Sequence, residues 1–278
     1  MKSRREALFI VSHSRHMPAL GITLLIESGG KVVIGAALVT LGLGLSGAMG
    51  GVVLGAFGAL AWGLSWVPRN ALTLERTPTT ASLLRAAAPV GATLALFAIL
   101  TNADLIAAKV LVAPRDAGHY AAANTAGKIL IYATWPVWAV LFPALGREGR
   151  PSQLNRRRLA TGIGATLLIG APIMILYWMN PGLVTTVLFG VQYSASVRLL
   201  LPLGMAMLAY EVAFLSMSYE LAVGRVRYLG VAALSVVILL GLLTLIPRTL
   251  VGFAHATLAV SVATATVTTG FAFISDGR

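Results

Sequence analysis

The residues of this chain best suited to chemistry are the few charged and amide side chains that interrupt its apolar stretches. The segment TNADLIAAKVL (101–111) carries Asn102, Asp104 and Lys109. In water these side chains would form an ordinary solvated face. In a lipid bilayer a charge is expensive, and it usually marks an ion path, a substrate site or a partner charge. The chemistry therefore depends on the solvent that surrounds these residues.

The composition of the chain indicates a bilayer. Charged residues make up 11% of the 278 residues, about half the usual share in soluble domains. Several stretches without Asp, Glu, Lys or Arg approach or exceed the roughly 20 residues that cross a membrane. These stretches are 32–68, 86–103, 129–146, 159–197, 228–247 and 249–275. Together with a mean hydropathy of +0.86, they predict an all-α, polytopic membrane protein.

We expect eight membrane-spanning helices with both termini in the cytoplasm. The expected spans are about 20–43, 48–67, 84–111, 119–144, 157–178, 197–222, 227–246 and 250–273. Fifteen Lys and Arg fall in the two termini and alternate loops, whereas three fall in the remaining loops. Lys and Arg are enriched on the cytoplasmic side, so the fifteen define that side. This distribution also explains the net charge of +12 without a nucleic-acid partner.

The first expected span carries an acid and a base, Glu27 and Lys31, four residues apart. An acid one turn before a lysine is the favourable order on a helix. The two residues form either a self-neutralising pair near the inner surface or a site in which Lys31 faces a hydrated cavity. Both interpretations remain open at the level of the sequence.

A second group of polar residues recurs at intervals of four in the span 119–144. Tyr120, Asn124, Lys128 and Tyr132 should form a polar stripe along one helical face. We expect Lys128 to lie at the same depth as Asp104 and to pair with it. Such a pair either serves function or only holds two helices together.

Glu211 lies near the middle of the span 197–222, with no basic residue within a turn. Desolvation penalises the charged form of a carboxyl without a partner. Glu211 is therefore a candidate for a proton or coupling-ion site, and the alternative is a hydrogen-bonded structural carboxyl. Glu220, by contrast, lies close to Arg225 and Arg227 and is expected at the membrane interface without a further role.

The sequence offers little for catalysis or metal binding. The chain has no cysteine, which excludes thiolate chemistry and Cys-based metal sites. His13 and His16 are too few ligands for a metal site, and no catalytic motif is present. The expected outer loops are short and contain few polar groups. We therefore predict no catalytic residues, no metal and no cofactor, and we do not expect an enzyme.

Two segments of the chain are similar to each other. Residues 35–60 and 230–260 both read as a helix that opens on Gly and Ala, a tight turn and a second helix. Transporter folds are commonly built from such repeats. Small and branched residues also recur by chance in membrane helices, so a repeat and shared composition are both possible explanations.

Several longer motifs resemble a known family. NADLIAAKVLVAPRDAGHYAAANTAGKIL (102–130) is similar to the segment of polysaccharide-export flippases in which an Asp-bearing helix leads through a short outer turn into the next helix. LFPALGRE (141–148), VLFGVQYSASVRLLLPL (187–203) and LAVGRVRY (221–228) resemble later parts of the same proteins in the same order. The resemblance runs from about 20 to 275, and the family is the Wzx-type oligosaccharide flippases of the MOP superfamily, related to the lipid II flippase.

The resemblance implies a function in the bacterial inner membrane. Members of this family move undecaprenyl-pyrophosphate-linked oligosaccharide between leaflets, and polysaccharide assembly proteins are expected partners besides the lipid bilayer. Cationic cavity residues would meet the pyrophosphate, and acidic residues would couple transport to an ion. The expected substrate-binding residues are Lys31, Lys128, Asn124 and Tyr120. The expected intramembrane acids are Asp104, Glu211 and Glu27.

The resemblance also implies two six-helix lobes, of which this chain would hold the second and part of the first. We expect a cytoplasmic lead-in (1–19), the last two helices of an incomplete first lobe (20–67), a cytoplasmic linker (68–83) and a six-helix second lobe (84–278). The first four helices of the family would then be missing. A truncated or non-transporting membrane partner is therefore an alternative function. An integral-membrane polysaccharide polymerase or ligase is a further alternative.

Overall fold

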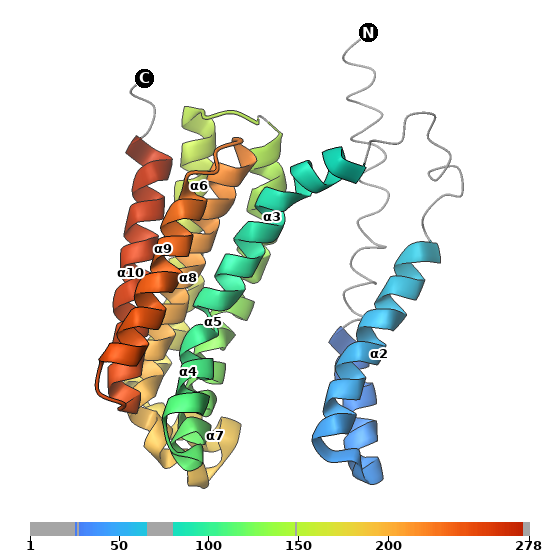
Figure 1. Cartoon of the computed structure of the whole chain (residues 1–278), viewed down its shortest axis with the longest axis vertical. Helices are drawn as coiled ribbons and strands as arrows, with labels where there is room; N and C mark the ends of the chain where they lie inside the picture. Colours follow the sequence, from blue (N-terminus) through green and yellow to red (C-terminus); the bar gives the residue numbers. More distant parts are fainter. Residues whose placement is uncertain (1–25, 27, 66–79, 148, 275–278) are drawn as a thin grey trace. The chain divides into compact units, whose positions relative to one another are not determined.

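In the computed structural model the described residues are 26, 28–65, 80–147 and 149–274, and all regular structure within them is helical (Figure 1). The chain divides into two compact units, 1–78 and 79–278. Each unit is described by itself below. Glu27, the histidines at 13 and 16 and most of the expected linker lie outside the described residues.

The first unit contains a hairpin of two antiparallel helical arms. The first arm covers residues 28–38 and ends in a π-helical turn, η1 (Val39–Leu43), and the second arm is α2 (Gly44–Ser65). The chain reverses at Gly42 and Gly44, whose φ angles of 89° and 50° suit residues without a Cβ. Both glycines lie in LGLGLSG (41–47), a glycine-rich segment typical of a turn.

Glycine lets the two arms of this hairpin approach closely. Gly51 of the second arm lies directly against the backbone of Gly35 in the first arm. Gly30 of the first arm faces Gly55 of the second, and a Cβ on Gly30 would lie 3.1 Å from the Gly55 Cα. Nearer the turn, a Cβ on Gly47 would lie 2.8 Å from the Leu38 carbonyl carbon. Small residues at helix interfaces are the usual way for membrane helices to gain close packing.

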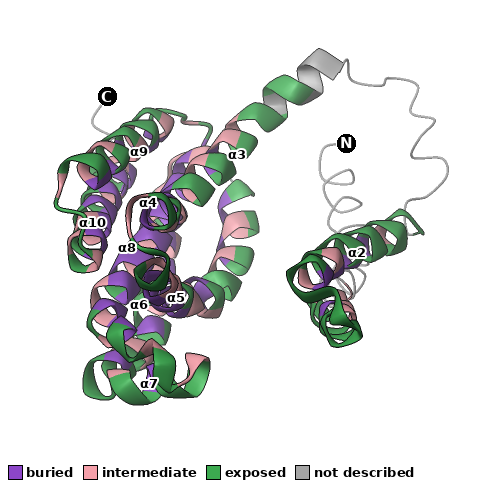
Figure 2. Cartoon of the chain, turned by 60° about the horizontal axis from the view of Figure 1, so that its bottom comes forward, coloured by how far each residue is buried: buried purple, intermediate pink, exposed green. Residues whose placement is uncertain are grey.

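The second unit is a bundle in which one central helix contacts most of the others. In chain order its elements are α3 (Thr80–Leu100), α4 (Ala103–Leu111), α5 (Pro114–Gly146), α6 (Gln153–Met179), α7 (Pro181–Phe189), η3 (Val191–Ser196), α8 (Val197–Ala222), α9 (Tyr228–Leu245) and α10 (Leu250–Ile274). Helix α8 packs against α10, α5 and α6, and it is the most buried of the long helices (Figure 2). The core of the unit therefore surrounds α8.

The number of membrane-crossing helices agrees with the sequence. Within the described ranges, seven helical stretches are long and apolar enough to cross a membrane. One of them, Ser28–Ser65, is the hairpin of the first unit and supplies two arms, and α3 and α4 together form one broken span, Ala87–Leu111. The prediction of an all-α polytopic membrane protein with about eight helices is confirmed.

Candidate functional site

The candidate site lies where the third expected span breaks. Helix α3 ends at Leu100, and α4 begins at Ala103, so Thr101 and Asn102 interrupt the helix within the membrane-spanning stretch. At the interruption the Asn102 backbone N–H donates to the Ile99 carbonyl at 3.1 Å instead of to Ala98. The Asn102 side-chain amide donates to the Ala98 carbonyl at 2.7 Å, and the Thr101 hydroxyl adds a bond to the Phe97 carbonyl at 2.9 Å. The broken backbone is thus held by its own polar side chains.

Immediately after the break, Asp104 forms a buried polar cluster with two residues of α5. The Tyr120 hydroxyl donates to Asp104 Oδ2 at 2.8 Å, and the Asn124 amide donates to the same oxygen at 3.0 Å. All three residues have a relative exposure of 0%. Tyr120 and Asn124 lie four residues apart, so one face of α5 presents both donors. Asp104 also occupies the first turn of α4, where the helix dipole favours a negative charge.

The cluster retains unused oxygen acceptors. Asp104 Oδ1 and Asn124 Oδ1 are buried without a hydrogen-bond partner among the described residues, and so is the Tyr210 hydroxyl of α8. Tyr210 packs in the same core cluster as Tyr120. Carboxylate, amide and phenol oxygens are the types of group that bind a proton or a small hard cation, which prefers oxygen ligands.

The expected ion pair between Asp104 and Lys128 is not formed directly. No salt bridge joins them in the described part of the chain, and Lys128 Nζ instead donates to Asn102 Oδ1 at 2.6 Å. The reason is depth. Helix α5 begins at Pro114 rather than at 119, which moves Lys128 about 7.5 Å further from the α4–α5 turn than the sequence suggested. Tyr120 and Asn124 therefore meet Asp104, and Lys128 meets Asn102.

The polar stripe of α5 also turns away from the core along its length. Tyr120 and Asn124 are fully buried, Lys128 is half-buried, and Tyr132 is 72% exposed. Each residue advances about 100° around an α-helix, so twelve residues leave Tyr132 about 120° from Tyr120. Residues spaced four apart therefore share one helical face over only two or three turns.

Two further carboxyls of α8 have opposite surroundings. Both carboxyl oxygens of Glu211 are buried without a hydrogen-bond partner among the described residues. Glu220 accepts from Arg227 Nε at 3.0 Å, and Arg225 Nη1 lies 3.9 Å from its other oxygen. Glu220 thus lies beside both arginines that follow it in the sequence, whereas Glu211 has no basic partner among the described residues.

The remaining candidate cation, Lys31, lies in the first unit and is half-buried there. Its expected partner, Glu27, lies outside the described residues. Lys31 and the Asp104 cluster therefore belong to separate units. Within the described ranges, no three His, Cys, Asp or Glu side chains gather as a metal site would require.

Sequence reasoning missed two parts of this site. Asn102 was noted only as a polar residue, although it both stabilises the helix break and binds Lys128. Tyr210 was not considered, because a tyrosine in an apolar span usually packs without further function. Asn102 also lines a mostly apolar groove of about 510 Å³ between α3–α4 and α9, so the Lys128–Asn102 contact borders an open space.

The comparisons with known proteins add no assignment. No family model, no curated protein and no solved structure matches this chain.

Proposed function

We propose that this chain, alone or as part of a larger assembly, is a flippase-type transporter. Its substrate would be a polyprenyl-pyrophosphate-linked oligosaccharide crossing the bacterial inner membrane for polysaccharide export. The observation that carries the proposal is the buried Asp104–Tyr120–Asn124 cluster beside a helix break within a membrane span. A cluster that only joined helices would not need to interrupt one of them.

The helix break supports transport because broken membrane helices are a recurring element of transporter sites. Non-helical backbone at membrane depth persists only inside protein or along a hydrated cavity. In transporters, the ends of half-helices and the freed backbone groups bind substrates and coupling ions. Thr101 and Asn102 place such a break next to the acid Asp104, and Asn102 itself accepts a hydrogen bond from Lys128.

Lys128 supports the choice of an anionic substrate. A pyrophosphate cannot cross hydrocarbon unaided, and a lysine can bind phosphate as a point charge. The Asn102 carbonyl oxygen holds the Lys128 ammonium without neutralising it. The lipid tails of the substrate can stay in the bilayer, so only the charged head group needs a polar path. Lys31 remains a second candidate for this role on the basis of the sequence alone.

Asp104 and Glu211 support coupling to an ion. Intramembrane carboxylates commonly act as proton relays or ion sites in pumps and transporters. The unused oxygens of Asp104, Asn124 and Tyr210 would take the ion at the cluster. Glu211 would exchange a proton between inward-facing and outward-facing states, because no partner among the described residues holds it in its charged form.

Reconstitution in liposomes tests the proposal. We expect the protein to move a fluorescently labelled polyprenyl-pyrophosphate sugar above the level of empty vesicles, and we expect Lys128→Ala to lose most of this activity. Lys109→Ala is the matched control, since Lys109 is exposed near the end of α4. Equal activity in protein-containing and empty vesicles would contradict the proposal and favour a non-transporting partner. Equal loss in both lysine variants would remove Lys128 from the substrate path.

A further inference from the structure

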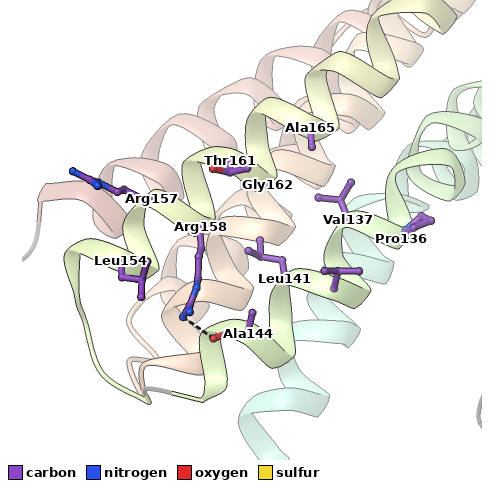
Figure 3. A pocket seen from close by; sticks show the side chains of 11 residues that line it. Pro136, Val137, Leu141, Ala144, Leu154, Arg157, Arg158, Thr161, Gly162 and Ala165 are labelled. Carbon is purple, nitrogen blue, oxygen red and sulfur yellow. Dashed lines mark hydrogen bonds between the residues drawn. The ribbon is translucent and has the colours of Figure 1, made fainter. Parts of the chain in front are cut away.

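A second feature of the bundle lies away from the Asp104 cluster. A groove of about 620 Å³ runs between α5 and α6, near the turn that joins them (Figure 3). Val137, Val140 and Leu141 line it from α5, and Thr161 and Ala165 line it from α6. Both helices are long and apolar enough to cross a membrane, and the groove residues Val140 and Leu154 are exposed, so the groove opens on an apolar surface of the second unit.

A glycine and a proline shape the contact between α5 and α6 along the groove. A Cβ on Gly162 would lie 2.7 Å from Leu141 Cδ2, so glycine lets Leu141 lie directly against α6. Pro136 interrupts the hydrogen bonding of α5 at one end of the groove, and Ala144 lines the other end. The two helices therefore touch closely where Leu141 meets Gly162.

Two arginines stand at the end of the groove nearest the turn. Arg158 Nη1 donates to the Ala144 carbonyl at 3.0 Å and to Asn155 Oδ1 at 2.9 Å, so its guanidinium is fixed across that end (Figure 3). Asn155 is itself buried and donates to the Leu145 and Arg150 carbonyls. Arg157 is exposed at the rim, with its side chain directed outward.

The surrounding sequence strengthens this positive charge. Residues 147–158 contain five arginines and one glutamate, Glu148. An apolar slot that ends in an excess of positive charge complements a molecule with a long apolar chain and an anionic head. The volume of the groove also lies within the range of roughly 300–1,000 Å³ that is usual for small-molecule sites.

We propose that this groove binds one anionic glycerophospholipid of the surrounding leaflet. An acyl chain lies between α5 and α6 over Leu141 and Gly162, and the phosphate lies at Arg157 and Arg158. Hydrogen bonds already hold the Arg158 guanidinium in place, and the exposed Arg157 side chain folds over the head group. A zwitterionic lipid has no net negative charge to pair with the two arginines, so it should bind here no better than at other apolar surfaces of the bundle. The proposal is independent of transport activity.

Native mass spectrometry tests the head-group contact. The full-length protein is extracted from vesicles containing equal amounts of phosphatidylglycerol and phosphatidylethanolamine, and the lipids that remain bound are counted. We expect one retained phosphatidylglycerol, and we expect Arg157→Gln to lower its occupancy about fivefold, the size of one exposed ion pair. Arg85→Gln makes the same charge change at an exposed residue of α3 outside the groove, and it should retain the lipid. Equal retention of both lipids, or equal loss in both variants, would overturn the proposal.

A steric variant tests the groove itself. Thr161 is exposed and lines the groove, so Thr161→Trp should fill the space and displace the retained phosphatidylglycerol. Ala160→Trp is the matched control, because Ala160 is exposed on the same turn of α6 but does not line the groove. Circular dichroism confirms that both variants are folded. Retention of the lipid by Thr161→Trp would show that arginine charge alone binds it and would overturn the groove site.

Discussion

Asp104 and Glu211 are both carboxyls with no exposed surface in the same bundle, yet their surroundings differ. Asp104 follows a helix break, and two donors of α5 bind one of its oxygens. Glu211 lies within the unbroken α8, and neither of its oxygens has a partner among the described residues. The fold therefore organises polar residues around the first acid and leaves the second among neighbours that do not bind it.

This difference separates two roles that burial alone does not distinguish. A buried charge is tolerated when hydrogen bonds satisfy it, whereas an unpaired buried charge costs far more than a neutral group. The Asp104 cluster is consistent with a charged group held in a fixed geometry. The surroundings of Glu211 favour a neutral acid that accepts charge only when the structure changes. The predictions below separate these roles by stability.

The largest expected effect concerns removal of each acid. Asp104→Leu should lower the free energy of unfolding by about 3 kcal/mol, because it leaves the Tyr120 hydroxyl and the Asn124 amide buried without an acceptor. Glu211→Leu should be neutral or stabilising, because it removes two unsatisfied oxygens from the core. Unfolding in mixed detergent micelles measures both. A larger loss for Glu211→Leu than for Asp104→Leu would reverse the assignment of roles.

A smaller effect is expected for the two tyrosines next to Asp104. Tyr120→Phe removes a hydrogen bond to the carboxyl and should cost about 2 kcal/mol. Tyr210→Phe should change stability by less than about 0.5 kcal/mol, because its hydroxyl has no partner among the described residues. The same unfolding assay compares them, and equal losses would indicate that Tyr210 also binds within the cluster.

The smallest effect concerns Lys128. A double-mutant cycle with Asn102→Leu and Lys128→Met should give a coupling energy of about 1 kcal/mol, because the two side chains share a hydrogen bond. The corresponding cycle between Lys128 and Asp104 should give less. A stronger coupling of Lys128 to Asp104 would support the direct pair that the sequence predicted.

The sequence was sufficient for the helices and for one turn, and it was insufficient for the contacts between helices. Long apolar stretches determine where spans lie, and Gly42 and Gly44 predict the reversal of the first hairpin. The partner of Lys128 depends on where α5 begins and on the break at Thr101. The expected start of α5 at residue 119 differs by five residues from the observed start at Pro114, and this difference replaces Asp104 by Asn102 as the partner of Lys128. The groove at Gly162 could not be predicted, because it depends on which α5 side chain meets that glycine.

The most direct test of the account measures ion-coupled transport by conservative variants in liposomes. A proton or sodium gradient is imposed, and movement of the labelled polyprenyl-pyrophosphate sugar is compared for the wild type, Asp104→Asn and Tyr132→Phe. Tyr132 is the control, because it belongs to the same stripe of α5 but is exposed. We predict that Asp104→Asn folds but loses at least about tenfold in gradient-driven transport, while Tyr132→Phe retains it. Full gradient-driven transport by a folded Asp104→Asn variant would contradict the claim that the Asp104 cluster is the coupling site.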